Sequence, residues 1–123
     1  MNVVVDGSPL TVDDVVDVAL GRTDAVPGDH LDERMEPARA LVERIVANDE
    51  TVYGITTGFG ALANTRIRRE QATDLQYDLL RSHAAGVGSH LDPEIVRAML
   101  LCRARTLAQG HSGVRPEIVR YLL

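Results

Sequence analysis

The sequence predicts a mainly α-helical fold with a short β-hairpin at its N-terminus and a glycine-rich loop between helical segments. Apolar residues recur at intervals of three and four in several segments, as they do on one face of a helix. Asp6-Gly7 follows the β-branched run at residues 3–5, a pattern typical of a hairpin. Glycines and threonines gather at residues 51–67, where the helical period is lost.

Composition bounds the size and the surface of this fold. The chain has 123 residues, of which 45% are apolar and 25% are charged, so we expect a single domain over residues 1–123. The formal net charge is −5 and the isoelectric point about 5.2, which argues against a nucleic-acid partner. Arg66, Arg68 and Arg69 form a local basic cluster, which we interpret as the solvated start of a helix.

The N-terminus gives no sign of export or membrane insertion. It lacks the basic region of a secretory signal, and no apolar span of 18 residues occurs in the chain. We therefore expect a soluble, cytoplasmic protein without membrane contact.

The first half of the chain is predicted to contain a ribbon and two helices. Residues 1–10 form the β-ribbon and residues 11–50 the helices. Thr11 and Asp14 have the spacing of a capping box, so the first helix runs from Thr11 to about Leu20. The second spans about residues 29–47 and carries one apolar face, formed by Leu31, Met35, Ala38, Val42 and Ile45.

Helices are also predicted over residues 68–123. One covers about residues 68–84. Asp92 and Pro93 supply an N-cap and a proline at the first helical position, which starts a helix that runs to about residue 108. Pro116 opens the last helix, which reaches Leu123 without a glycine cap or polar tail. We expect the chain to stop within a helix, as a truncated domain does.

The glycine-rich loop at residues 51–65 does not fit a phosphate-binding loop. A phosphate loop requires a lysine and a preceding strand, but the chain has no lysine and a helix is predicted before the loop. A dinucleotide fingerprint is not matched either, so we expect no nucleotide. Tyr53 in this loop has two interpretations: an aromatic anchor on the core, or a phenol that acts as acid or base.

The histidines and the cysteine give no metal or disulfide signal. His30, His83, His90 and His111 lack the spacing of a zinc site, and we expect no metal. His83 stands out because a helix ends there at a glycine-rich turn. Cys102 is the one cysteine, and its apolar helical context predicts a buried structural thiol.

Three motifs resemble one enzyme family. The stretches TVYGITTGFGALANTRI, DLLRSHAAGVG and RTLAQGHSGVRPEIV together resemble, in order and spacing, the N-terminal portion of the aromatic amino acid lyases and aminomutases, and of the histidine ammonia-lyases in particular. The resemblance covers essentially the whole chain. It implies a helical subunit of a homotetramer that eliminates ammonia from L-histidine to give trans-urocanate.

The resemblance also implies roles for residues of the loop. Tyr53 stands at the position of the family's catalytic base or proton shuttle, and Gly60 and Leu62 stand where the family lines the substrate pocket. The resemblance implies that this loop closes over the active site as a lid. Its other members are Gly54, Thr57, Gly58 and Phe59.

The pair Ser82-His83 stands where the family sets its substrate preference. An imidazole at this place can exchange a hydrogen bond with a substrate imidazole, so L-histidine is the expected substrate. A phenylalanine- or tyrosine-acting lyase or an aminomutase is the alternative. Arg105 departs from the family, which usually has Asn there, and it would need a partner.

The family's electrophile is a methylidene-imidazolone made from an internal Ala-Ser-Gly. That triplet is absent from the chain, and Ala84-Ala85-Gly86 lacks the serine. The prosthetic group cannot form from this chain, so we expect the isolated chain to be inactive and to self-associate through unpartnered apolar faces. The alternative is a non-catalytic module that binds an amino acid, or one half of a split lyase.

Overall fold

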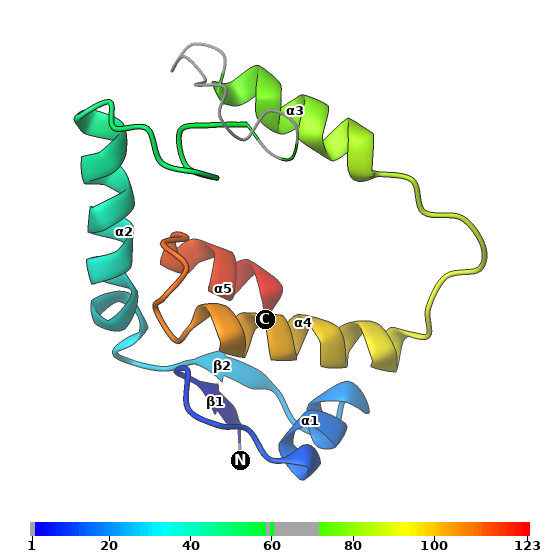
Figure 1. Ribbon diagram of the computed structural model, residues 1–123. Coiled ribbons are helices and arrows are strands. Elements are labelled where there is room, and N and C mark those ends of the chain that lie inside the picture. Colours follow the sequence, from blue (N-terminus) through cyan, green and yellow to red (C-terminus); the bar gives the residue numbers. More distant parts are fainter. Residues whose placement is uncertain (1, 59, 61–71) are drawn as a thin grey trace. The chain divides into compact units, whose positions relative to one another are not determined.

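The computed structural model describes residues 2–58, 60 and 72–123. In chain order it contains β1 (Val3–Val5), α1 (Val12–Ala19), β2 (Ala25–Pro27), α2 (Leu31–Ala47), α3 (Ala72–His83), α4 (Pro93–Leu107) and α5 (Pro116–Leu122) (Figure 1). The mainly helical fold class is confirmed. Its helices begin and end close to the predicted limits, and residues 68–71 of the third predicted helix lie outside the described residues.

The contacts within the chain define two compact units, which are described separately. Unit 1 comprises Met1–Leu41 and His90–Leu123, and unit 2 comprises Val42–Ser89. The single domain expected from the sequence stays a prediction.

The predicted N-terminal hairpin is wrong. β1 pairs in parallel with β2, with Val3 opposite Ala25, Val4 opposite Val26 and Val5 opposite Pro27 (Figure 1). The two strands are therefore joined by the crossover through α1, as parallel strands must be. The ribbon within residues 1–10 is reduced to one strand, and its partner comes from a later segment that the sequence pattern did not reveal as a strand.

Asp6-Gly7 does turn the chain, but toward α1. The Asp6 carboxylate accepts a hydrogen bond from the Ser8 N–H at 2.8 Å, which lowers the pKa of Asp6. Gly7 has φ +92°, and a Cβ atom there would lie 2.7 Å from the Ala108 carbonyl oxygen. The glycine is thus required by close packing against the end of α4 as well as by the turn.

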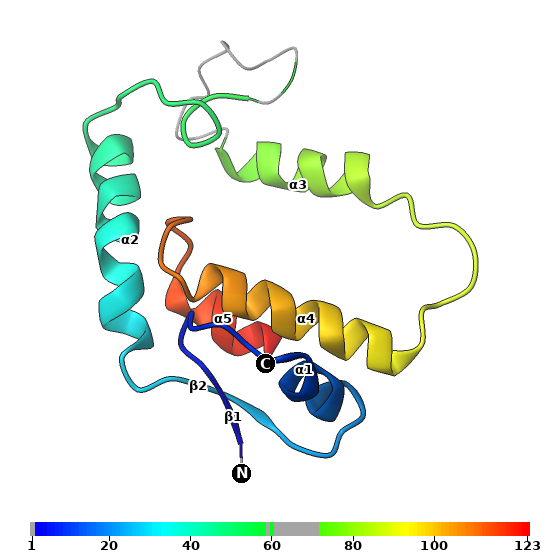
Figure 2. The same ribbon diagram turned by 60° about the horizontal axis from the view of Figure 1, so that its bottom comes forward.

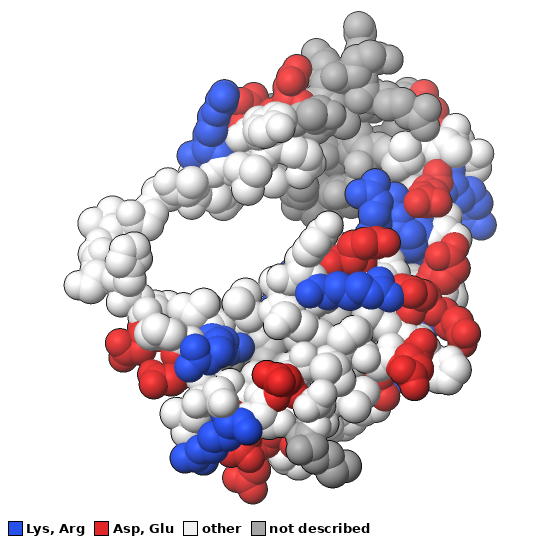
Figure 3. Space-filling view, turned by 180° about the vertical axis from the view of Figure 1, so that it is seen from behind, with Lys and Arg blue, Asp and Glu red and all other residues white. Residues whose placement is uncertain are grey.

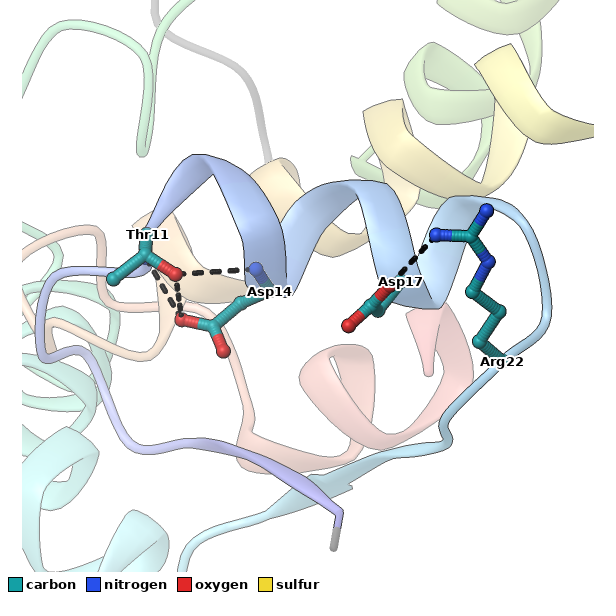
Figure 4. A network of polar contacts seen from close by, with 4 residues as sticks. All are labelled: Thr11, Asp14, Asp17 and Arg22. Atoms are coloured by element: carbon teal, nitrogen blue, oxygen red, sulfur yellow. Dashed lines mark hydrogen bonds and ion pairs between the residues drawn. The ribbon is translucent and has the colours of Figure 1, made fainter.

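The capping box at the start of α1 is confirmed (Figure 4). The Asp14 N–H donates to Thr11 Oγ1 at 3.1 Å, and the Thr11 N–H donates to the Asp14 carboxylate at 2.8 Å. Hydrogen bonds from Thr11, its side chain first, lower the pKa of Asp14. At the other end α1 has no basic residue in its last turn, and Arg97 of α4 donates to the Ala19 carbonyl at 2.7 Å instead.

Unit 1 has a continuous apolar core. α4 packs against both α1 and α5 (Figure 2), and the sheet and the start of α2 complete the cluster. Its buried members are Val3, Val5, Val18, Leu31, Met35, Leu101, Ala104, Leu107, Ala108 and Val119. Burial of each large member stabilises the fold by about 1.5–3 kcal/mol before entropy is counted. Cys102 is not part of this core: it is exposed, so the predicted buried thiol is wrong.

Polar contacts tie distant segments of unit 1 together. Arg105, for which the sequence demanded a partner, donates from Nε to the Ser8 carbonyl at 2.9 Å. Arg120 of α5 donates to both carboxylate oxygens of Asp32 at 2.9 and 2.7 Å. Both contacts are exposed to solvent, so they fix the positions of these segments more than they stabilise the fold.

Unit 2 contains the end of α2, the loop and α3. Among its described residues the buried ones are Ile45, Thr57 and Gly58. Local hydrogen bonds, more than apolar burial, therefore define the described parts of this unit.

Candidate active site

Tyr53 lies in a tight turn a few residues after the end of α2. The N–H groups of Ile55 and Thr56 donate to the Val52 carbonyl at 3.1 and 3.0 Å, which closes the turn. Gly54 has φ +75°, a conformation that glycine adopts without strain. Tyr53 is 64% exposed, so most of this residue lies at the surface.

Two threonine hydroxyls hold the backbone on both sides of Tyr53. Thr56 Oγ1 accepts from the Val52 N–H at 2.8 Å and donates to the Glu50 carbonyl at 2.6 Å. Thr57 Oγ1 accepts from the Gly54 N–H at 3.2 Å and donates to the Gly58 carbonyl at 3.1 Å. The amides before and after the tyrosine thus take side-chain acceptors in place of a helix or a strand.

Ser82 and His83 lie at the C-terminal end of α3 and contact each other. Ser82 Oγ lies 2.8 Å from His83 Nδ1, and Ser82 Oγ donates to the Leu79 carbonyl at 2.8 Å. His83 Nδ1 is also 3.0 Å from the same carbonyl oxygen. Both side chains are exposed, and their hydrogen bonds to described residues stay within α3.

The other predicted site residues lie in the loop, which is described only in part. Gly60 is exposed with φ +56°, and a Cβ atom there would meet nothing within 4 Å. Gly58 is buried, and Thr57 is 4% exposed. Phe59 and Leu62 lie outside the described residues. The structure thus brings together Ser82 with His83, and Gly54 with Thr57.

The hollow described in unit 1 is not built from these residues. It has a volume of about 180 Å³ and is lined by parts of α1, β2, α4 and the C-terminal residues Leu122 and Leu123. Its one arginine, Arg97, is already bonded to the Ala19 carbonyl. None of the predicted site residues lines it, so it offers no support for the same chemistry.

The described residues contain neither a metal-binding cluster nor a membrane-spanning helix. Within residues 2–58, 60 and 72–123, no group of three His, Cys, Asp or Glu side chains lies close enough to hold a metal ion. In the same part of the chain, every helix is too short or too polar to cross a membrane. On the face in Figure 3, arginines lie beside acidic side chains, the mixed charge typical of a solvated surface.

Residues 10–123 match the family model of the aromatic amino acid lyases, described as "Aromatic amino acid lyase". The chain belongs to this family. A histidine ammonia-lyase from Gloeobacter violaceus is 51% identical over 120 residues, which are 98% of this chain and 23% of that protein.

Solved structures of the lyase and aminomutase family share its fold. An ergothioneine-degrading enzyme from Treponema denticola has a TM-score of 0.91 at 29% identity, and a tyrosine aminomutase from Streptomyces globisporus has 0.88 at 35%. Each match covers 99% of this chain and 24% of the solved one. The chain thus spans about a quarter of the length of its relatives.

Sequence reasoning missed two contributors to this candidate lyase site. Thr56 was not singled out, although a threonine two or three residues after a Tyr-Gly turn has the spacing to accept from the turn's amides. The Leu79 carbonyl was missed because backbone acceptors carry no sequence signal. An i, i+4 pairing of His83 with residue 79 is the only available hint.

Proposed function

We propose that this chain supplies part of the active site of a histidine ammonia-lyase, which converts L-histidine to trans-urocanate and ammonia. The observation that carries the proposal is the lyase family match over residues 10–123, combined with an exposed Ser82–His83 pair held at a helix end. The similarity to the Gloeobacter violaceus histidine ammonia-lyase supports this substrate over others.

Each site residue has a role in this proposal. Tyr53, presented on its turn, is the base or proton shuttle for the carbon beside the leaving amine. Ser82 and His83 contact the substrate ring, and Gly60 and Leu62 line its pocket. The lid consists of Gly54, Thr57, Gly58 and Phe59. Glycine at positive φ in this lid allows the backbone to come close to a substrate.

The residues of this chain do not fit the family's prosthetic group. The Ala-Ser-Gly precursor of the methylidene-imidazolone does not occur in the sequence. Ala84-Ala85-Gly86 follows α3 directly and is exposed, but it has no serine to dehydrate. The proposal therefore assigns no step on that group to this chain, and it predicts that the 123-residue chain alone is inactive.

The remaining parts of the proposal concern the assembly. The chain acts with the other three quarters of a lyase polypeptide, in a cytoplasmic homotetramer, and uses neither metal nor nucleotide. Exposed apolar side chains on α4 are available for such packing, with Ile95 46% and Met99 58% exposed.

The test is complementation with urocanate absorbance as the readout. The chain is incubated with L-histidine alone, and after co-expression with the part of the Gloeobacter violaceus enzyme that it does not match. We expect no product from the chain alone and urocanate from the pair, abolished by Y53F. Turnover by the chain alone would overturn the predicted inactivity, and a folded pair without product would contradict the proposed substrate.

The second candidate is a tyrosine-acting lyase or aminomutase. The tyrosine aminomutase, with a TM-score of 0.88, favours it. Product analysis of the same complemented pair with L-tyrosine decides: conversion of tyrosine but not of histidine selects this candidate. A third outcome, heat of binding for L-histidine by calorimetry without turnover in any pair, selects the non-catalytic binding module.

A further inference from the structure

Three atoms at the end of α3 form a closed triangle. Ser82 Oγ and the Leu79 carbonyl oxygen are 2.8 Å apart, Ser82 Oγ and His83 Nδ1 are 2.8 Å apart, and His83 Nδ1 and the Leu79 oxygen are 3.0 Å apart. All three separations are within hydrogen-bond range. The carbonyl oxygen can only accept, so the other two atoms must share the donors.

The triangle distinguishes the two neutral forms of the imidazole. If Nδ1 carries the proton, it donates toward Ser82 Oγ and the Leu79 carbonyl, the Ser82 hydroxyl donates to that carbonyl, and all three contacts are attractive. If Nε2 carries the proton, the Nδ1 lone pair faces the carbonyl oxygen at 3.0 Å, and the Ser82 hydroxyl must serve two acceptors. A neutral imidazole has one donor and one acceptor nitrogen, and the bond at one nitrogen sets the role of the other.

We propose that Ser82, in addition to its place beside the substrate ring, positions His83: its hydroxyl favours the Nδ1–H tautomer, so that Nε2 is a hydrogen-bond acceptor for the substrate ring. The inference rests on the proposed function for the identity of the ligand. It deepens that function by naming the ring chemistry: an aromatic ring that carries a donor, such as an imidazole N–H or a phenol O–H. A phenyl ring offers no donor to Nε2.

The geometry also explains why the pair is adjacent in the sequence. Ser82 reaches back three residues and His83 four residues to the same carbonyl, because residues three and four apart lie on one face of a helix. A serine followed by a histidine there can therefore lock the ring without help from another element.

The experiment reads the tautomer directly in the 123-residue chain. Long-range ¹H–¹⁵N NMR is recorded at about pH 8, above the ordinary histidine pKa of about 6.5. The His83 ring is assigned by its loss in H83Q, and the exposed His90 and His111 serve as internal references. We expect a protonated Nδ1 and a bare Nε2 at His83. A predominant Nε2–H form would overturn the proposal.

Two variants separate the role of the hydroxyl from that of the helix. S82A removes the hydroxyl and should raise the Nε2–H population, whereas S82T retains a hydroxyl and should restore the wild-type tautomer. Ser82 is exposed, and matching circular dichroism spectra confirm that both variants fold. A tautomer that is the same in S82A as in the wild type would also overturn the role of Ser82.

Titration with L-histidine tests the proposed function separately. A shift of the His83 Nε2 resonance with L-histidine, and none with L-phenylalanine, supports the ring contact. This titration is made with the complemented pair, which holds the whole proposed site. An Nδ1–H ring that does not respond to L-histidine in a folded pair would contradict the proposed substrate while the tautomer assignment stands, so the two failures are distinguishable.

Discussion

Unit 1 and unit 2 are stabilised in different ways. Unit 1 has ten buried apolar residues in one cluster, while the described part of unit 2 buries only Ile45, Thr57 and Gly58. Yet all the candidate site residues belong to unit 2. The apolar packing of unit 1 is thus separate from the local hydrogen bonds that surround the candidate site residues.

The largest expected loss of stability comes from a substitution in the core of unit 1. Leu101 is 2% exposed, and L101A leaves a cavity that should lower the free energy of unfolding by about 2–5 kcal/mol. Urea denaturation followed by circular dichroism measures it. The matched control is L80A in α3 of unit 2, where the leucine is 66% exposed, with an expected change within about 0.5 kcal/mol. Equal losses of stability in L101A and L80A would contradict the view that apolar burial stabilises unit 1 more than unit 2.

A close approach of backbones gives the next effect. G7A forces a Cβ into the Ala108 carbonyl at a positive φ, which should destabilise unit 1 by about 1–3 kcal/mol. G21A is the control, since Gly21 has φ +69° but open space around it. The loss should be smaller in G21A, in which strain acts without a clash. If thermal unfolding shows a larger loss of stability in G21A than in G7A, the close approach of Gly7 to the Ala108 carbonyl does not determine the stability of unit 1.

The capping box of α1 gives a smaller effect that depends on pH. T11A should cost about 1 kcal/mol at neutral pH. Hydrogen bonds from Thr11 lower the folded-state pKa of Asp14, so their contribution is present above about pH 4 and lost as pH falls through that folded value. The stability difference between wild type and T11A should therefore narrow in acid, while T11S retains most of it. A stability difference between wild type and T11A that widens below about pH 4 would refute the role of the ionised Asp14 carboxylate in the capping box.

A substitution in the Tyr53 turn should have the smallest effect on global stability and a clear effect on local hydrogen exchange. T56V keeps the shape of the side chain but removes the acceptor for the Val52 N–H. The exchange of that amide should accelerate about fivefold, since a typical hydrogen bond is worth about 1 kcal/mol. Global stability should change by less than about 0.5 kcal/mol. T56S keeps the hydroxyl and should exchange as the wild type does; if it exchanges as T56V does, the hydroxyl is not the cause.

The helices were predictable from the sequence, because each carries its own local signals. Thr11 and Asp14 mark the start of α1, and Pro93 and Pro116 mark those of α4 and α5. The sheet was not predictable, since its register pairs residues more than twenty positions apart and the Asp6-Gly7 signal is shared by hairpins and other turns. Cys102 was misplaced because apolar neighbours in a helix do not fix which face is buried.

For the site, the sequence revealed residue types but not their contacts. Tyr53, Ser82 and His83 were named from their motifs, and the structure adds that Thr56 and Thr57 bond the amides beside Tyr53 and that Leu79 supplies the oxygen that Ser82 and His83 share. These partners are a hydroxyl in a loop and a backbone carbonyl. Their roles depend on backbone geometry, which periodicity and motif spacing do not specify.

Residue-resolved hydrogen exchange in L101A tests the separation of fold and site most directly. The Val3 and Gly28 N–H groups donate to the Asp24 and Val5 carbonyls. Each loss of about 1.4 kcal/mol in the free energy of unfolding speeds exchange tenfold, so these two amides should exchange about 100-fold faster in L101A. The Val52 and Gly54 amides, held by Thr56 and Thr57, should exchange within about twofold of the wild-type rate. Equal acceleration of both pairs would contradict the account, because the site would then depend on the core of unit 1.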